Sequence, residues 1–323
     1  MIATVIRRLI HMAFVLVGIS ALVFLIFFAT PGTDPAARIA GRNATPATVA
    51  AVRKEFGLDK PLPVQYAVMM KHLFITRNLT SYVDRGEKIV PEIMEAAPVT
   101  LSLVTGAAII WMVFGALVGL VAAAFKDSWI DRGLMILSLV GISMPVFWLG
   151  EVVNLITQSR LHGTILFSWV PPLGYVPLTQ NPVLWFKALL LPWITLAVLY
   201  IGIYGRMLRA TLIETMDQDF IRTARAKGLS ERQVLVRHAL RCSLISFVTM
   251  FGLDFGVLVG GSALLTEVVF GLQGVGMLTY QSLQDLDLPT IMATVIYASF
   301  FVVISNTAVD ILYAFIDPRV RAR

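Results

Sequence analysis

Few residues of this chain have the types and spacings that catalysis requires. Its four histidines, His11, His72, His162 and His238, stand at no metal-ligand spacing from acids or cysteines. No Gly-Lys dipeptide occurs, so a phosphate-cradling loop for a nucleotide cannot form. The G-x-S-x-G pattern of serine hydrolases is missing as well. We therefore predict that the chain is not an enzyme and has no metal or cofactor of its own.

The basic residues gather in one segment, DFIRTARAKGLSERQVLVRHALR, which covers residues 219–241. It holds five arginines, one lysine and one histidine between two strongly apolar stretches. So much positive charge beside apolar sequence indicates a segment that contacts a partner or a membrane surface.

Local signals divide this segment into two helices. Gly228 can adopt the left-handed conformation that ends a helix at low steric cost. Ser230 and Gln233 then have the spacing of a capping box, and Leu229 and Val234 have that of a hydrophobic staple. We predict one helix that continues from the preceding apolar stretch to the residue before Gly228, a glycine turn, and a second helix.

The composition is that of an integral membrane protein. The 323 residues are 57% apolar and 14% charged, with a mean hydropathy of +0.79, whereas soluble domains have about 25% charged residues. A net charge of +6 is typical of the cytoplasmic lysine and arginine excess that orients such proteins. The single cysteine, Cys242, can form no disulfide within the chain and is predicted to be a buried bystander.

Six stretches are long and apolar enough to cross a bilayer as helices, which takes about 20 residues each. They are residues 12–29, 99–125, 133–156, 183–204, 244–269 and 290–315. The first is predicted to be a retained anchor, because Pro31 stands where a signal peptide would have its small-residue cleavage site.

Prolines and glycines within the spans are expected to shape them. Pro145 and Pro192 are expected to kink their spans. Gly115 and Gly119 have the small-xxx-small spacing of close helix contacts.

The basic residues predict which side of the membrane each connection occupies. An even number of spans places both termini on one side. Arg7 and Arg8 precede the first span, and three arginines follow the last. Residues 206–241 contain eight basic and four acidic residues, a net charge of 8 − 4 = +4. Because short cytoplasmic loops are enriched in lysine and arginine, the termini and the basic segment are predicted to be cytoplasmic.

The predicted fold is an all-α integral membrane protein with six transmembrane helices, a cytoplasmic helix in the basic segment and a small extracytoplasmic subdomain. Its parts are residues 1–29, the N-terminus and first span; 30–98, the subdomain; 99–315, a five-span core with the cytoplasmic loop 206–241; and 316–323, a cytoplasmic tail. In the subdomain, Thr45 and Pro46 predict a helix start, with an end at Phe56 before Gly57. A second helix is predicted over residues 63–75.

The residues alone leave three interpretations of the basic segment open. A short helix held across the cytoplasmic face, with Phe220, Ile221 and Ala224 among its basic residues, could dock into a groove of a partner protein. It could instead be an anchor among lipid headgroups. A helix–turn–helix that binds DNA is the third, but the flanking spans would keep a recognition helix from a groove of the duplex.

Acidic residues inside the predicted spans are costly and therefore face protein or water. Asp254 lies deepest, and two roles suit it: a polar group that lines a passage, or a hydrogen bond to another helix. Glu151, Glu267 and Asp310 lie nearer the ends of their spans, where packing or interface roles are expected.

The basic segment resembles the cytoplasmic EAA loop of permease subunits in ATP-binding-cassette importers, in the form found in the dipeptide and oligopeptide branch. The resemblance extends over nearly the whole chain. Further matching motifs are ATPGTDP at 29–35, GLDKPLPVQY at 57–66, VFGLQGVGMLTYQSLQDLDLPTI at 269–291 and DILYAFIDPRVR at 310–321. The long first outer loop is similar to that of the B-type subunit rather than its C-type partner.

The resemblance implies a heteromeric importer of the bacterial inner membrane. In this family a second, C-type permease completes the passage, one or two cytoplasmic ATPases bind ATP and magnesium, and an external binding protein delivers a peptide. The EAA helix of such a permease fits a cleft of an ATPase. Membrane lipid is expected to surround the chain, and nucleic acid is not an expected partner. The implied coupling residues are Asp219, Phe220, Arg222, Thr223, Ala224, Arg225, Ala226, Gly228 and Leu229.

Two positions depart from the family pattern. Thr223 replaces the family's glutamate, so no salt bridge can start from that position. Ser246 replaces the usual proline, which affects how sharply the chain bends into the fifth span.

The competing class is a stand-alone secondary transporter or channel. It would show two matching halves around a central ion site, and the halves of this sequence do not match.

Overall fold

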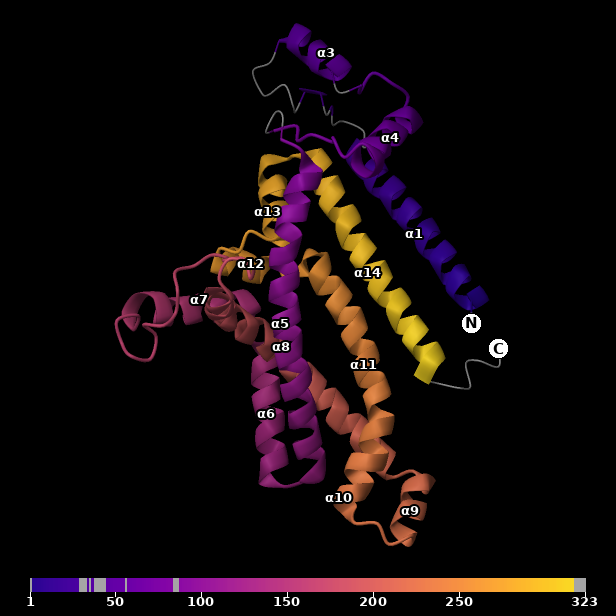
Figure 1. Cartoon of the computed structure of the whole chain (residues 1–323), viewed down its shortest axis with the longest axis vertical. Helices are drawn as coiled ribbons and strands as arrows, with labels where there is room; N and C mark the ends of the chain where they lie inside the picture. Colours follow the sequence, from indigo (N-terminus) through magenta and orange to yellow (C-terminus); the bar gives the residue numbers. More distant parts are fainter. Residues whose placement is uncertain are drawn as a thin grey trace.

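The computed structural model describes residues 2–28, 34, 36–37, 45–55, 57–83 and 87–316. Figure 1 labels most of its helices, and short π-helical segments carry the label η. The elements are α1 (Ile2–Phe28), α3 (Pro46–Glu55), α4 (Leu62–Met70), η1 (Lys71–Ile75), α5 (Ile89–Ala124), α6 (Trp129–Ser143), α7 (Val146–Asn154), η2 (Leu155–Arg160), α8 (Pro182–Met216), α9 (Asp219–Ala226), α10 (Glu231–Gln233), η3 (Val234–Ala239), α11 (Leu240–Val257), η4 (Leu258–Ser262), α12 (Leu264–Phe270), α13 (Val275–Asp285) and α14 (Leu288–Ile316).

The described residues form an all-α membrane protein, as the sequence predicts. Five helical stretches are long and apolar enough to cross a membrane: Leu9–Phe28, Ile89–Ala124, Pro182–Met216, Glu231–Ser262 and Leu288–Val309. The pair Trp129–Ser143 and Val146–Ser159 meets the same test jointly but is bent by 91°. The described part of the chain therefore has five straight candidate spans, and a sixth when the bent pair is taken as one.

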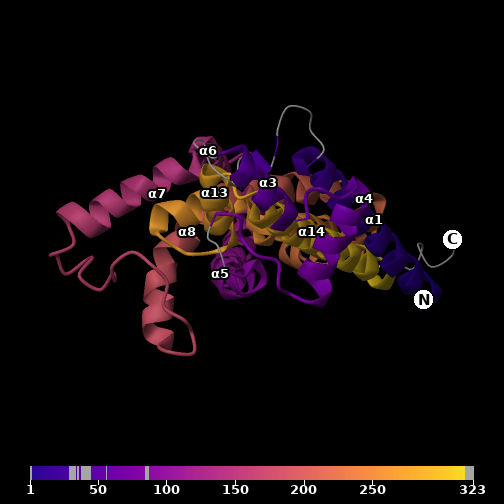
Figure 2. The same ribbon diagram turned by 90° about the horizontal axis from the view of Figure 1, so that it is seen from above.

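The predicted third span, 133–156, is broken rather than kinked. α6 ends at Ser143, Met144 has an extended ψ of 122°, and Pro145 precedes α7. A residue before proline avoids helical backbone angles because the proline ring would clash with it. Seen from above in Figure 2, α7 and the loop after it extend to one side of the bundle. Pro192, by contrast, lies inside the continuous helix α8.

Two other predicted span boundaries are wrong. Residues 244–269 do not form one helix, because Gly261 has a φ of 108° that interrupts η4 before α12 begins. Such a φ lies outside the helical region and is accessible to glycine. The second span begins at Ile89 instead of residue 99, with Pro98 inside α5. Proline has a φ compatible with a helix and removes one hydrogen bond, so its presence does not require the helix to start there.

The core of the bundle is the close pair α5 and α8. A Cβ atom on Gly115 would lie 2.9 Å from the Cβ of Tyr204, and one on Gly119 would lie 2.8 Å from the Cβ of Leu208. Gly205 faces Val118 at 2.7 Å in the same way. The two helices can approach this closely because glycine has no side chain, and the predicted role of Gly115 and Gly119 is confirmed. Packed against α5, α8 extends as one continuous helix towards the basic segment.

The subdomain before α5 contains the two predicted helices. The side chain of Thr45 accepts a hydrogen bond from the amide of Thr48 at 3.2 Å, and α3 ends at Glu55 before Gly57, which has a φ of 64°. Phe56, the predicted last residue of this helix, lies outside the described residues. The second predicted helix, 63–75, is α4 followed by η1.

One buried carboxylate joins this subdomain to the chain between α13 and α14. Asp287 accepts hydrogen bonds from the hydroxyl of Ser81 at 2.7 Å, the amide of Tyr82 at 3.0 Å and the hydroxyl of Thr290 at 2.5 Å. The contacts link positions more than 200 residues apart in sequence. These hydrogen bonds therefore hold Ser81 and Tyr82 of the subdomain against the α13–α14 connection.

The prediction that Cys242 is buried is wrong, because its side chain is exposed on α11. Ser246, Leu253 and Val257 are exposed at helical spacing along the same face of this helix. The side chain of Asp310, most of the motif at 29–35 and residues 317–323 lie outside the described part of the chain.

Candidate functional site

The basic segment forms the end of the molecule opposite α3 and α4, as Figure 1 shows. α8 ends at Met216, and α9 begins at Asp219 after the extended residue Gln218, with a φ of −77° and a ψ of 154°. The predicted single helix from the fourth span through Lys227 is therefore wrong. The break lets α9 turn, so that its apolar side packs under the bundle, which a continuous helix would not allow.

α9 has one buried face and one exposed face. Ile221 is 0% exposed and Ala224 is 6% exposed, and both belong to the same core cluster as Val234 and Leu235 of η3. Full burial of a side chain such as Ile221 contributes about 1.5–3 kcal/mol. The exposed side chains of α9 are those of Asp219, Phe220, Arg222, Thr223, Arg225 and Ala226. α9 is thus anchored on one side and presents a mainly polar, basic surface on the other.

The predicted glycine turn after α9 is confirmed. Gly228 has a φ of 83°, its amide donates to the carbonyl of Arg225 at 2.9 Å, and the amide of Leu229 donates to the carbonyl of Ala224 at 3.4 Å. These two bonds form a Schellman motif, which satisfies carbonyls at the helix end. No heavy atom would lie within 4 Å of a Cβ on Gly228. The constraint at this position is therefore the backbone angle, not the available space.

The second half of the turn is fixed by the predicted capping box. The amide of Gln233 donates to the hydroxyl oxygen of Ser230 at 3.4 Å, and the amide of Ser230 donates to the Gln233 side chain at 3.2 Å. The Arg225 guanidinium also donates to both oxygens of Glu231, at 2.8 and 3.1 Å. Hydrogen bonds from α9 and from the start of α10 thus both fix the conformation of the turn.

Thr223 uses its hydroxyl within the helix. It donates to the carbonyl of Asp219 at 3.1 Å. The Asp219 carboxylate pairs instead with Arg222 at 3.2 Å, and both side chains are largely exposed. Exposed pairs of this kind stabilise a helix by about 0.5 kcal/mol or less. The charges on this face therefore remain available to a partner.

A buried ion pair holds α8 beside α6 shortly before α9 begins. The Arg209 guanidinium donates to both oxygens of Asp131 at 2.5 Å, and the Asp131 side chain is 3% exposed. The same carboxylate accepts from the amide of Asp127, and Ser128 caps α6 by accepting from the amide of Asp131. The α5–α6 turn and the end of α8 are thereby fixed to each other.

Asp254 bonds to a neighbouring helix. The hydroxyl of Tyr204 on α8 donates to Asp254 at 2.8 Å, and the carboxylate is half-buried on α11. Tyr204 also packs edge-on against Phe247, with ring centroids 5.1 Å apart. The structure agrees with the expected hydrogen bond between helices, while a passage-lining role for Asp254 stays a prediction.

Glu267 is more buried than Asp254 and Glu151, the other acids of the predicted spans whose side chains the structure describes. It is 0% exposed, accepts from the hydroxyl of Thr100 at 2.6 Å and accepts from the amide of Met277 at 2.9 Å. Thr100 in turn accepts from the amide of Val275 at 2.9 Å. The predicted packing role is confirmed, because this carboxylate ties α12, α13 and α5 together. Glu151, by contrast, is exposed on α7.

Comparison with known proteins identifies the family of the chain. The model of the binding-protein-dependent transport system inner membrane component matches residues 115–322, and the model of its N-terminal part matches residues 1–104. Together they account for nearly all of the sequence. The chain belongs to this permease family.

Several named relatives are similar to this permease along their full length. A Brucella abortus protein, provisionally named a peptide transport system permease, is 40% identical over 321 residues, which cover 99% of each chain. The glutathione transport system permease of Salmonella choleraesuis is 37% identical over 325 residues and 99% of each chain. The dipeptide transport system permease of Alkalihalophilus pseudofirmus is 34% identical over 341 residues, 99% of this chain and 100% of the relative.

Sequence reasoning missed several residues that position the site in this permease. Asp131, Arg209 and Thr100 carry no local signal, because their partners lie far away in the sequence. Glu231 could have been found, since an acidic residue soon after a turn can reach back to a basic residue on the preceding helix. Among the described residues, no group of three His, Cys, Asp or Glu side chains is placed to hold a metal ion.

Proposed function

We propose that this permease is the B-type subunit of an ATP-driven importer for peptides or peptide-like molecules. The peptide, dipeptide and glutathione cargoes in the names of its full-length relatives support this class. A peptide loses several kcal/mol if its polar groups enter hydrocarbon unpaired. A second, C-type permease therefore completes a polar route through the membrane, which Asp254 helps to line.

The proposed topology has six spans, with α6 and α7 counted as one, and both termini in the cytoplasm. Its support is that the start of α1 and the end of α14 lie near each other, and both helices run away from the α3–α4 end of the molecule towards these points, as Figure 1 shows. On this assignment α9 is cytoplasmic, and the subdomain before α5 is outside. The surface joined by Asp287 then receives the external binding protein.

The function rests on the exposed face of α9, which we assign to a cleft of a cytoplasmic ATPase. The outward side chains Asp219, Phe220, Arg222, Thr223, Arg225 and Ala226 would meet the ATPase. Ala224 and Leu229 face the bundle and Gly228 sets the turn, so these three would hold the helix in place. One or two such ATPases bind ATP and magnesium, and the permease itself catalyses no reaction.

Reconstitution into lipid vesicles tests this function against the secondary-transporter alternative. The permease alone, or with an ion gradient, is expected to take up no peptide. Uptake is expected only when the second permease, the ATPases, the binding protein and ATP are all supplied. Uptake by this chain alone, driven by a proton or sodium gradient, would contradict the proposal.

A further inference from the structure

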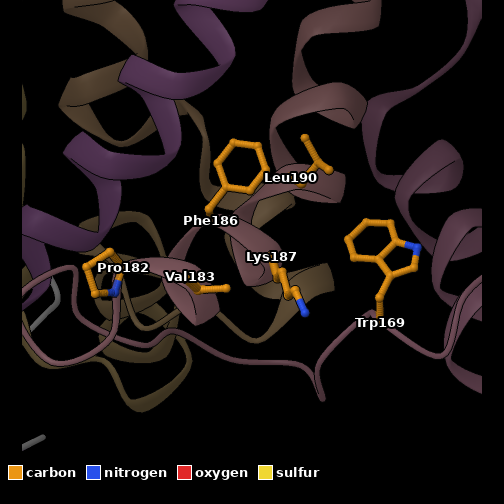
Figure 3. Close-up of a pocket in the computed structure, with 6 residues that line it drawn as sticks. All are labelled: Trp169, Pro182, Val183, Phe186, Lys187 and Leu190. Atoms are coloured by element: carbon orange, nitrogen blue, oxygen red, sulfur yellow. The ribbon is translucent and has the colours of Figure 1, made fainter.

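A pocket lined by the start of α8 and the preceding loop contains Lys187, which has no ion-pair or hydrogen-bond partner within the described part of the chain. The pocket has a volume of about 530 Å³ and is lined by Trp169, Pro182, Val183, Phe186, Lys187 and Leu190. In Figure 3 the Lys187 side chain extends from α8 away from Phe186 and Leu190, with Trp169 to its side. Among the described residues, none forms an ion pair or a hydrogen bond with this lysine, which is half-buried on an apolar wall. A cation in such a place requires an anion or water at its ammonium group.

A long apolar groove between α5 and α8 adjoins the pocket. This groove has a volume of about 960 Å³ and shares Phe186 and Leu190 with the pocket. Its wall on α8 reaches Ile201, and Ile109 and Phe114 line it on α5. From Phe186 to Ile201 the helix rises by about 22 Å. One leaflet of the hydrocarbon core is about 15 Å deep, so the groove is long enough for an acyl chain.

Tryptophan marks the level of this pocket in the membrane. Trp169 lines the pocket, and Trp185 lines the adjoining groove. Tryptophan favours the headgroup region, and lysine near a helix end extends its ammonium group to the same level. If the outer membrane surface is placed at Trp169 and Trp185, the cation lies at headgroup depth and the groove runs from it into the hydrocarbon.

We propose that this pocket and groove bind a membrane phospholipid, with its phosphate on Lys187 and one acyl chain between α5 and α8. A molecule with an anion at one end and a long apolar chain fits both parts at once. Phosphatidylglycerol is the preferred class, because its headgroup carries no ammonium group to be repelled by the lysine. The bound lipid fills the outer side of the α5–α8 pair.

Native mass spectrometry of the full-length permease in uncharged detergent tests the site. Dioleoyl phosphatidylglycerol is expected to bind tightly at one site, and dioleoyl phosphatidylethanolamine more weakly. Lys187→Gln should weaken phosphatidylglycerol binding by about tenfold, as expected for the loss of one charged hydrogen bond. Lys71→Gln is the matched control, because it removes an exposed lysine that lines neither cavity. Equal weakening by both variants, or no tight binding to the native chain, would overturn the proposal.

Two further measurements probe the groove itself. Thr105 is exposed in its wall, so Thr105→Trp should occupy the groove and weaken binding of both lipids. Unchanged lipid binding in that variant would count against the acyl-chain position. A photoreactive residue at position 109, in membranes that contain the assembled importer, should form an adduct with phospholipid. An adduct with the second permease instead would show that protein covers this face and would overturn the assignment.

Discussion

Arg209→Ala is expected to destabilise the folded permease by about 3–5 kcal/mol, because it leaves the Asp131 carboxylate buried without its cation. That carboxylate is 3% exposed and receives two hydrogen bonds from Arg209. The amide of Asp127 alone cannot balance a full negative charge there. The expected observation is a large fall in the thermal unfolding temperature of the purified protein in detergent.

Two further variants test whether the loss of stability comes from the buried ion pair or would follow from removing any charged side chain. The double variant Arg209→Ala with Asp131→Ala should recover part of the loss, since it removes both charges together. Arg222→Ala breaks an exposed pair and should change stability by about 0.5 kcal/mol or less. If Arg209→Ala were no more harmful than Arg222→Ala, the ion pair would not fix α8 to α6.

Gly228→Val is expected to reduce ATP-driven uptake by about tenfold while the permease still inserts and assembles. The residue has a φ of 83°, and a left-handed backbone costs a non-glycine residue about 1–2 kcal/mol. A β-branched side chain resists it further. The α9 end would then lose its Schellman bonds, and ATP hydrolysis would proceed with less transport for each ATP.

Gly228→Asn is the matched control for this effect. Asparagine tolerates left-handed angles better than other residues, and a Cβ at this position has open space around it. The variant should therefore retain most of the coupling, measured as peptide transported per ATP hydrolysed in vesicles. Equal loss in both variants would mean that added bulk, rather than the backbone angle, disturbs the contact.

The local parts of the site were predictable because their signals lie close together in sequence. Gly228, Ser230 and Gln233 fall within six residues, and the turn they predict is the turn observed. The glycine spacing on α5 likewise predicted the close helix contact, because it depends on one helix alone.

The breaks in the helices were harder to predict from composition. Hydropathy cannot distinguish a kink from a break, so the sequence predicts one kinked span where the structure has a 91° bend at Pro145. Gly261 has a φ of 108° but lies in an apolar stretch with no local sign of a break. The end of α8 at Met216 also has no strong local signal, and the burial of Ile221 after the break is a contact with the rest of the bundle.

Contacts between distant segments were beyond local patterns altogether. Asp131 and Arg209 are separated by 78 positions, and Thr100 and Glu267 by 167. A single sequence contains no signal that pairs such residues. The sequence shows that Asp131, Arg209 and Glu267 are ionisable, but the structure is required to show that Arg209 pairs with Asp131 and that Thr100 hydrogen-bonds to Glu267.

Disulfide crosslinking of α9 in the assembled importer tests the central claim most directly. The exposed Cys242 is first replaced by serine, and single cysteines are placed at Ala226, on the exposed face, and at Ala224, on the buried face. With paired cysteines along the cleft of the ATPase, position 226 should form a crosslink and position 224 should not. If no cysteine on the exposed face of α9 crosslinks to the ATPase, this helix does not couple the permease to ATP hydrolysis.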